Sequence, residues 1–329
     1  MNLKDVSLSI YSFGYSAGFI HDDRPEAAPP VVSIENIADL AVAHGLGGIE
    51  FPVDRYFPAA QLGELGAFVD DCKQRGLTVA IDVEIFDVGY IRKLLPVLAE
   101  HRLAFARVKM SGMHGGNRYA EPEFTSWVDL FVSQLRSLLP ELRRHGVRLL
   151  IENHQDLGSD DLIAIIDATS AEHIGINWDT GNSLAVLDTP EEFLRKSAHA
   201  IGNVHLKDYR LYRCDTGFRM ARCALGEGVV DLAAVLPTLK DLDHVVPLAI
   251  ELGAENCRRV EVFKPEYWEA YPSYDVASKV SFFSFLNQKL LDGDEWRSAW
   301  ERDLPGAAII ESEMDDLERS VAYLERLAV

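Results

Sequence analysis

The stretch RLLIENH, residues 148–154, sets the pattern that decides the fold. It is a short apolar run that ends in polar side chains of the kinds that bind metals or transfer protons. Three later runs have the same arrangement. These are IGINWD at 174–179, NVHLKD at 203–208 and LAIELG at 248–253. Short β-type runs separated by helical patterns are typical of a parallel sheet with crossover helices. The four runs therefore predict consecutive strands whose polar ends meet.

Four further runs towards the N-terminus complete the strand pattern. They are Leu8–Gly14, Gly47–Pro52, Thr78–Glu84 and Phe105–Gly112. Helix signals lie between the strands, and the clearest is TPEE at 189–192, where a capping Thr, a Pro and a Glu coincide. Eight β/α units within about 255 residues match the usual size of a (β/α)8 barrel. No GxGxxG follows the first run, so the sequence predicts an α/β protein with a (β/α)8 TIM barrel rather than a dinucleotide fold.

The C-terminal residues exceed what a last barrel helix requires. They contain an aromatic loop at 264–274, an amphipathic helix at 278–293 and a terminal helix at 312–327. We predict a barrel core over residues 1–254 and a C-terminal helical and aromatic extension over 255–329. The extension is expected to pack on the barrel or on a partner subunit.

Composition excludes several classes of partner. The formal net charge of −20 argues against a nucleic-acid or anionic membrane surface, because both require clustered Lys and Arg. No run approaches 18 apolar residues and the N-terminus lacks a signal-peptide pattern. The four cysteines form no CxxC pair, so they suggest neither a zinc site nor a disulfide framework. We expect a soluble, cytoplasmic protein without nucleic-acid or membrane partners.

Alternation along the strands places four polar residues inside the barrel mouth. One rotation of the barrel points these side chains inward: Glu152, Asp179, His205 and Glu251. A lone acid at a strand end is more often a helix cap or an ion-pair partner. Three carboxylates and an imidazole crowded together, however, would repel unless a cation lay between them. We therefore predict that these four residues bind one divalent metal ion.

The chemistry of these four side chains indicates which metal they would hold. Oxygen ligands dominate, with a single nitrogen and no thiolate, and this set suits Mn²⁺, Mg²⁺ or Co²⁺ better than a structural zinc ion. Mn²⁺ is the expected cofactor, with Mg²⁺ and Co²⁺ as alternatives.

The stretches IENH, NWDTGN, NVHLKD and AIEL carry a family resemblance, supported by GIEF at 48–51 and GEG at 226–228. Over roughly residues 5–255 the sequence resembles the xylose-isomerase-like TIM barrels, in particular the sugar phosphate isomerase/epimerase family. The resemblance implies a keto or aldo sugar whose oxygens bind the metal, with Glu152 and Glu251 as acid and base. One would remove a proton alpha to the carbonyl, and a carboxylic acid would return it.

Five other side chains are candidates for the site. His154 shares a face with the strand-five glutamate, nearer the opening, and is either a catalytic residue or a satisfied structural histidine. Lys207 either contacts substrate or neutralises a ligand carboxylate. Asn182 occupies a place where some epimerases of the family carry a substrate-contacting His. Glu50 either binds sugar hydroxyls or pairs with Lys109, and we predict that all except His154 bind substrate.

Two loops carry weaker signals. Residues 209–228 contain Arg210, Arg213, Arg219 and Arg222, which either bind phosphate or form ion pairs with the surplus of acids, the second being favoured. The glycine-rich MSGMHGGNRY at 110–119, which includes His114, is a candidate mobile lid.

Several functions compete at this stage. The first is a sugar isomerase or epimerase, and the second a lyase that starts with the same proton abstraction. Within the second, the aromatic extension and the ENH at 152–154 resemble the alpha subunit of C-glycoside deglycosidases. That resemblance implies a 3-keto C-glycoside substrate, His154 as base and a small beta subunit bound through the extension. A homo-oligomer is the other expected assembly.

Two further classes are disfavoured. An endonuclease of the related DNA-repair branch would require three metals, more histidines and a basic face. A non-catalytic barrel would tolerate loss of the four predicted ligands, all of which are present.

Overall fold

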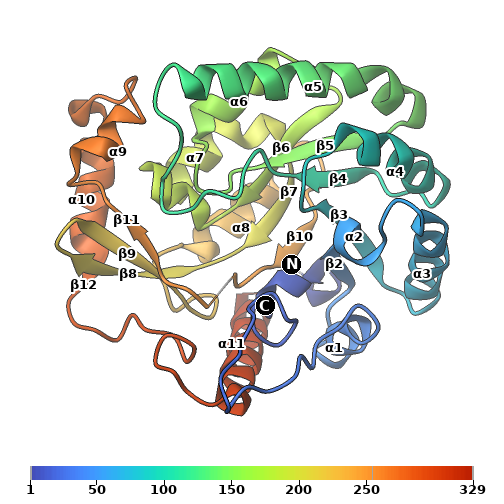
Figure 1. The fold of residues 1–329 in the computed structure, drawn as a ribbon, viewed down its shortest axis with the longest axis horizontal. Coiled ribbons are helices and arrows are strands. Elements are labelled where there is room, and N and C mark those ends of the chain that lie inside the picture. The colour runs from blue at the N-terminus through green and yellow to red at the C-terminus, as the bar shows by residue number, and fades with distance from the viewer. Residues whose placement is uncertain (1, 254, 328–329) are drawn as a thin grey trace.

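Eight parallel strands form a closed barrel in the computed structural model, which describes residues 2–253 and 255–327 (Figure 1). The barrel strands are β1 (Val6–Ser9), β2 (Gly48–Pro52), β3 (Thr78–Val83), β4 (Phe105–Val108), β5 (Arg148–Glu152), β6 (Ile174–Asp179), β7 (Ile201–Leu206) and β10 (Leu248–Ile250). The barrel closes where β10 pairs with β1, with Val6 opposite Leu248. The predicted (β/α)8 barrel is therefore confirmed.

Most strands end earlier than the sequence predicted. The expected strands ran on to Gly14, Gly112, His154 and Gly253, whereas β1, β4, β5 and β10 end five, four, two and three residues earlier, respectively. The extra residues leave the ladder and form the mouth of the barrel. Glu251 consequently follows β10, although its backbone N–H still donates to Leu206 O on β7 at 3.1 Å.

Helices surround the barrel and bury their apolar faces against it. They are α1 (Ile37–Ala43), α2 (Val53–Tyr56), α3 (Leu62–Gln74), α4 (Val88–Glu100), α5 (Glu123–His145), α6 (Ser159–Asp167), α7 (Pro190–Ser197) and α8 (Leu232–Lys240). The predicted cap of α7 is present, since Thr189 Oγ1 accepts from Glu192 N at 3.2 Å. Ile151, Ile176 and Val204 are fully buried in the main core, as expected for side chains that face the helices.

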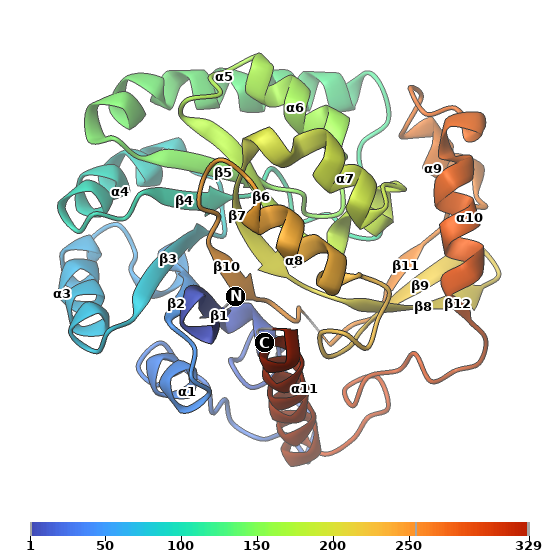
Figure 2. The ribbon, with the colours of Figure 1, turned by 180° about the vertical axis from the view of Figure 1, so that it is seen from behind.

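An antiparallel hairpin replaces the loop expected over residues 209–228. Strands β8 (Tyr209–Cys214) and β9 (Gly217–Arg222) pair across a turn, and β11 (Arg258–Val260) and β12 (Leu290–Leu291) extend them into a second sheet. The helices α9 (Pro265–Glu269) and α10 (Val280–Lys289) lie beside this sheet in Figures 1 and 2. Phe218, Tyr271 and Phe282 belong to the separate apolar core between them.

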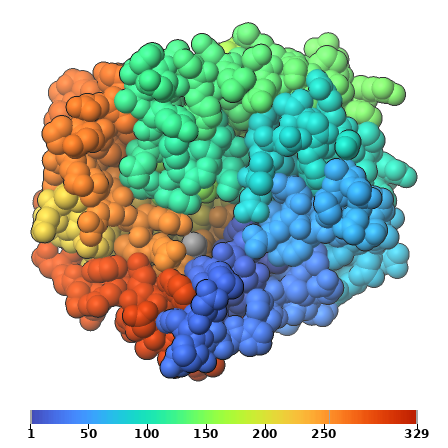
Figure 3. Space-filling view, viewed as in Figure 1, coloured from blue at the N-terminus to red at the C-terminus, as the bar shows by residue number. Residues whose placement is uncertain are grey.

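The last helix, α11 (Gly306–Leu327), joins the ring around the barrel. Leu317, Val321 and Leu324 belong to the main core, and both ribbon views place α11 beside α1 and the start of the chain. In the space-filling view the red C-terminal and blue N-terminal residues meet along one border (Figure 3). Residues 255–305 thus form an insertion that packs against the hairpin and extends its sheet, while α11 takes the place of an eighth barrel helix. The boundary at 254/255 stays a prediction, and residue 254 lies outside the described part.

Candidate active site

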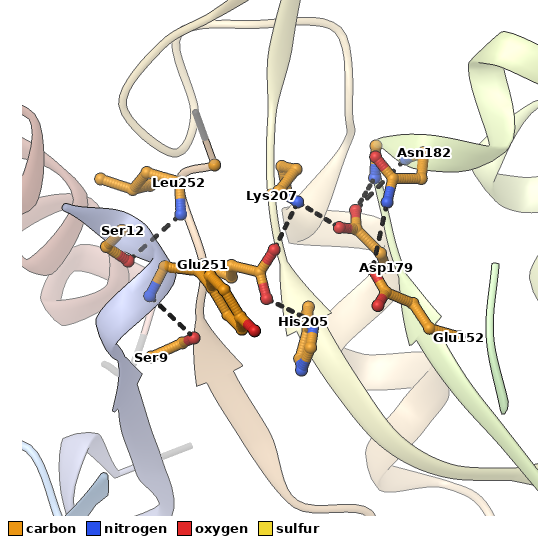
Figure 4. Close-up of polar contacts among 12 residues, drawn as sticks. Ser9, Ser12, Glu152, Asp179, Asn182, His205, Lys207, Glu251 and Leu252 are labelled. Atoms are coloured by element: carbon orange, nitrogen blue, oxygen red, sulfur yellow. Dashed lines mark hydrogen bonds and ion pairs between the residues drawn. The ribbon is translucent and has the colours of Figure 1, made fainter. Parts of the chain in front are cut away.

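The four predicted ligands come together at the mouth of the barrel (Figure 4). Each offers one ligand atom, and these atoms all lie within 4.8 Å of one another. Glu152 and Asp179 end β5 and β6, His205 lies in β7, and Glu251 directly follows β10. All four side chains are buried. The geometry can hold a metal ion, and the assignment of these residues as its ligands stays a prediction.

Two cationic side chains neutralise part of this cluster. Lys207 Nζ contacts Glu251 Oε1 at 2.7 Å and also pairs with Asp179 Oδ2. Arg107, which projects inward from β4, pairs with Glu152. His205 Nδ1 lies 2.8 Å from Glu251 Oε2. Lys207 was predicted to contact substrate or to neutralise a carboxylate, and its contacts in the structure are of the second kind.

The ends of β5 and β6 are fixed by hydrogen bonds around Asp179. Asn153 Oδ1 accepts from Asp179 N at 2.7 Å, and Asn153 Nδ2 donates to Asp179 O at 2.9 Å. The Asp179 carboxylate accepts from Gly181 N at 3.1 Å and from Asn182 N at 3.2 Å. Asn182 Nδ2 then reaches Glu152 Oε1 at 3.3 Å. This arrangement holds two carboxylates in place by backbone and amide contacts.

A second group of candidate ligands shares His205 with the first and is called the second acidic layer. Glu50, Asp82 and His205 also have ligand atoms within 4.8 Å of one another, and all three are buried. Glu50 pairs with His205 Nε2 and accepts from Asn203 Nδ2 at 3.3 Å. Among the described residues Glu50 does not pair with Lys109, contrary to one sequence-based alternative. The predicted contact of Glu50 with substrate stays untested.

The charge balance of the two layers favours a bound cation. Five buried carboxylates, Glu50, Asp82, Glu152, Asp179 and Glu251, face two buried cations, Arg107 and Lys207. Five minus two leaves three negative charges without a compensating side chain, or two when His205 is protonated. Buried charges of one sign are costly unless they are compensated, and a divalent ion would supply the missing charge.

Burial raises the pKa values of two carboxylates in this cluster. Burial raises the pKa of Asp179 to about 6, and Lys207 opposes that rise only in part. Burial, followed by the charge of Glu50, raises the pKa of Asp82 well above its ordinary value. Within the described chain, both Asp82 oxygens lack a hydrogen-bond partner. Donor set, charge and unpaired atoms all fit a hard divalent cation.

A cavity of about 260 Å³ lies over the cluster. Of the four predicted ligands, Glu251 lines the cavity, and Lys207, Asn182 and Arg107 line it while contacting the buried Asp179 or Glu152. The four predicted ligands and these three contacting residues are called the floor of the cavity. Its walls include Tyr11, Lys109, His114, His154, Tyr209 and Arg258. A larger hollow of about 980 Å³ is lined by α8 and residues 242–248 and does not touch the cluster.

Two histidines stand together in the cavity wall. The rings of His154 and His114 lie 4.7 Å apart, centroid to centroid. Burial lowers the pKa of His114 to about 3, and burial followed by the charge of Lys109 lowers the pKa of His154 well below its usual value. Both rings are therefore neutral near pH 7 and can accept a proton or a hydrogen bond. The catalytic role of His154 stays a prediction.

Residues 38–269 match the family described as Xylose isomerase-like TIM barrel. The chain belongs to this family. It is similar to the 3-oxo-isoapionate decarboxylase of Pectobacterium atrosepticum, with 30% identity over 141 residues. That match covers 40% of this chain and spans about half of the relative, 51% of its length.

Solved structures of other barrels superpose on this Xylose isomerase-like TIM barrel. L-ribulose 3-epimerase matches with a TM-score of 0.56 and 18% identity, covering 97% of each chain. The 3-keto-D-glucoside 4-epimerase from E. coli matches with a TM-score of 0.53 and 13% identity, covering 86% of this chain and 99% of that one. At such identities these likenesses show the fold. Within residues 2–253 and 255–327, every helix is too short or too polar to cross a lipid bilayer.

This Xylose isomerase-like TIM barrel also uses site residues that sequence reasoning missed. Gln155 Nε2 donates to Asn182 Oδ1 at 2.9 Å and lies 3.3 Å from the hydroxyl of Tyr209. Gln155 and Tyr209 each lie three residues beyond a barrel strand, β5 and β7 respectively, so their nearness to strand ends is a signal that the sequence did carry. Arg107 was also missed, although alternation in FARV places it on the inner face of β4.

Three of the four arginines named for the hairpin form ion pairs, as the favoured interpretation expected, whereas the Arg219 guanidinium lies 4.4 Å from the ring centroid of Trp296. Arg210 contacts Glu227 at 2.5 Å and Arg213 contacts Asp292 at 3.1 Å. Arg222 is buried and contacts Glu255 at 2.9 Å and Asp316 of α11 at 3.2 Å. It also donates to two backbone carbonyls near the barrel mouth, those of Ser12 at 3.1 Å and Gly253 at 2.9 Å.

Proposed function

We propose that this chain is a divalent-metal-dependent enzyme that removes a proton alpha to the carbonyl of a keto sugar, as a sugar isomerase or epimerase. The observation that carries the proposal is the buried cluster of Glu152, Asp179, His205 and Glu251 at the floor of a cavity. These four residues would hold the metal, with Mn²⁺ as the first choice and Mg²⁺ or Co²⁺ as alternatives. When bound, a divalent ion supplies Lewis acidity that polarises the carbonyl.

The two glutamates are suited to move the proton. Glu251 and Glu152 lie on opposite sides of His205 and Lys207 in Figure 4. Burial opposes ionisation of Glu251, but Lys207 and His205 outweigh it and lower its pKa, so this side chain is a carboxylate that can accept a proton. Glu152, whose Oε1 is oriented by Asn182, could return a proton from the other face. Transfer between two faces is what epimerisation requires.

Polar groups around the glutamates would position the substrate. Lys207 and Asn182 border the cavity and can contact sugar oxygens in addition to their present partners. Tyr11 and Tyr209 both line the cavity and can pack against the sugar while excluding water. Excluding water favours return of the abstracted proton over its loss to solvent.

A lyase is the second candidate, and one observation favours it. The relative named as a decarboxylase is 30% identical over 141 residues. In a lyase the same proton abstraction, or loss of carbon dioxide, would end in cleavage of a bond. Neutral His154 in the cavity wall would serve as base, as in the C-glycoside deglycosidase alternative, in which a small beta subunit would bind.

Hydrogen exchange distinguishes these outcomes. The Mn²⁺-loaded protein is incubated with ketoses and 3-keto glycosides in deuterated water and followed by NMR. Deuterium at the alpha carbon with an intact carbon skeleton is expected for the isomerase. Release of carbon dioxide or an aglycone would favour the lyase, and neither result across the panel would refute enolate chemistry.

Metal analysis tests the cluster independently of activity. Asp179→Asn and Glu251→Gln are expected to lose bound Mn²⁺ after dialysis, whereas Asp167→Asn and Glu172→Gln, at exposed positions, should retain it. Full occupancy in both cluster variants would refute the ligand assignment.

A further inference from the structure

The cavity wall contains two cationic side chains without an acidic partner. Lys109 and Arg258 line the cavity, and within the described residues neither has a carboxylate within ion-pair distance. The remaining cations of the lining are paired: Arg55 with Glu84, Arg107 with Glu152, and Lys207 with Asp179 and Glu251. On a chain with 52 acidic and 32 basic residues, unpaired cations inside a cavity are unexpected.

These two cations reach the cavity from different parts of the chain. Lys109 follows β4, two residues beyond Arg107, so alternation puts it on the same inner face and nearer the opening. His154 stands in the same relation to Glu152 on the adjacent strand β5. Arg258 comes from β11, in the insertion after the last barrel strand. The insertion thereby contributes a charge to the cavity of the barrel.

His114 shows that both charges act on one region. After burial, the largest influences that lower its pKa are the charges of Arg258 and then Lys109. Its Nδ1 is buried and has no hydrogen-bond partner in the described chain, and the same is true of His154 Nδ1. Two cations and two unpaired ring nitrogens therefore gather on one wall, above an anionic floor.

We infer that the substrate is an anionic keto sugar whose carboxylate binds Lys109 and Arg258. A guanidinium fork and an ammonium group match the two oxygens of a carboxylate, and charge-assisted hydrogen bonds are strong in a secluded site. The ring nitrogens of His114 and His154 would accept or donate to neighbouring hydroxyls. The inference deepens the proposed function, because it places the carbonyl end of the same substrate over Glu152 and Glu251.

Matched probes test the carboxylate. 5-Keto-D-gluconate and L-sorbose share a carbon skeleton and differ by a carboxylate in place of a hydroxymethyl group. Titration calorimetry with the Mn²⁺-loaded protein is expected to show at least about tenfold tighter binding of the acid. Equal affinity for the two probes would overturn the inference.

Variants show which residues produce the preference. Lys109→Met and Arg258→Met should each reduce the preference for the acid by about tenfold while leaving L-sorbose binding almost unchanged. Lys93→Met and Arg195→Met, at exposed positions outside the cavity, are the matched controls and should preserve the preference. A preference that survives both cavity substitutions would reflect direct binding of the acid to the metal and would overturn the inference.

Competition separates a carboxylate from a phosphoryl group. Inorganic phosphate and acetate are each used to displace 5-keto-D-gluconate. Displacement by acetate at least as effective as by phosphate is expected, and markedly stronger displacement by phosphate would overturn the carboxylate assignment.

The inference and the proposed function can fail separately. Deuterium exchange into a neutral ketose without any preference for the acid would leave the proposed function standing and remove the subsite. A preference that depends on Lys109 and Arg258, without metal binding or exchange, would support the subsite and remove the proposed function.

Discussion

The floor and the wall of the cavity are built in opposite ways. The floor consists of side chains at or next to the ends of β5, β6, β7 and β10, and it is rich in carboxylates. The wall draws on Lys109, His114 and Arg258, which lie outside the barrel strands, and its unpaired charges are positive. In this fold, strand ends supply chemistry and loops supply selectivity. We expect substitutions in the floor to abolish the reaction and substitutions in the wall to change what is bound.

The largest effect is expected at the floor. Glu152→Gln removes an acid or base group and should lower the rate of alpha-proton exchange by about 10²–10⁴-fold, measured by NMR in deuterated water. Glu172→Gln, an exposed change of the same kind, should leave the rate unchanged. A wild-type rate in Glu152→Gln would mean that the floor does not carry the chemistry.

The next effect concerns the junction that holds the wall to the barrel. Arg222→Met would leave Glu255, Glu313 and Asp316 without their buried cation, and should lower the free energy of unfolding by about 3–5 kcal/mol in urea titrations. Arg213→Met on the same hairpin breaks an exposed pair and should cost less than about 1 kcal/mol. Equal losses of unfolding free energy in the two variants would show that the buried ion pairs of Arg222 stabilise the fold no more than the exposed pair of Arg213.

His154 lines the wall but lies only two residues beyond Glu152 of the floor. Its substitution therefore tests whether wall residues affect binding alone or also the reaction. If the two glutamates transfer the proton, His154→Asn should lower the exchange rate by less than about tenfold and affect mainly KM. A fall of about 10²-fold or more in kcat would make the histidine a base and favour the lyase. Steady-state kinetics on the substrate found in the exchange panel distinguish these results.

The smallest effect, taken per pH unit, is the pH dependence of stability. Unfolded His114 binds a proton below about pH 6.5, whereas the folded chain holds it neutral down to about pH 3. The unfolded state thus binds more protons between these values, and His114 lowers stability as the pH falls through that window. His114→Asn should flatten the curve there by at most about 1.4 kcal/mol per pH unit, measured by urea unfolding from pH 7 to pH 4. If the free energies of unfolding of the variant and the wild type changed in parallel with pH, the pKa of His114 would not be lowered by folding, which would contradict its burial.

The floor could be predicted because strand periodicity is regular. Glu152, Asp179, His205 and Glu251 interrupt apolar runs at equivalent depths, so one rule of alternation brought them together. The family resemblance added their proposed roles. The second acidic layer was harder to predict, because Asp82 lies inside a strand and its significance depends on the neighbouring Glu50 and Arg107.

The wall could not be predicted because it depends on long-range packing. Arg258 follows the barrel strands in sequence, and only the pairing of β11 with β9 brings it to the cavity. The hairpin itself was hidden, since its arginines made residues 209–228 resemble a charged loop. The place of α11 in the ring of helices could not be predicted either, because residues 255–305 separate it in sequence from β10, the last barrel strand.

The position of α11 has a consequence for biosynthesis. Glu313 on this helix accepts hydrogen bonds from Tyr15 N and Ser16 N, both at 2.8 Å, in the segment that follows β1. A ribosome makes every barrel strand, the hairpin and the insertion before it makes this helix. Until the helix emerges from the exit tunnel, the apolar surface that Leu317, Val321 and Leu324 cover is exposed on the nascent chain. Chaperones that bind such surfaces would have their longest opportunity during that interval.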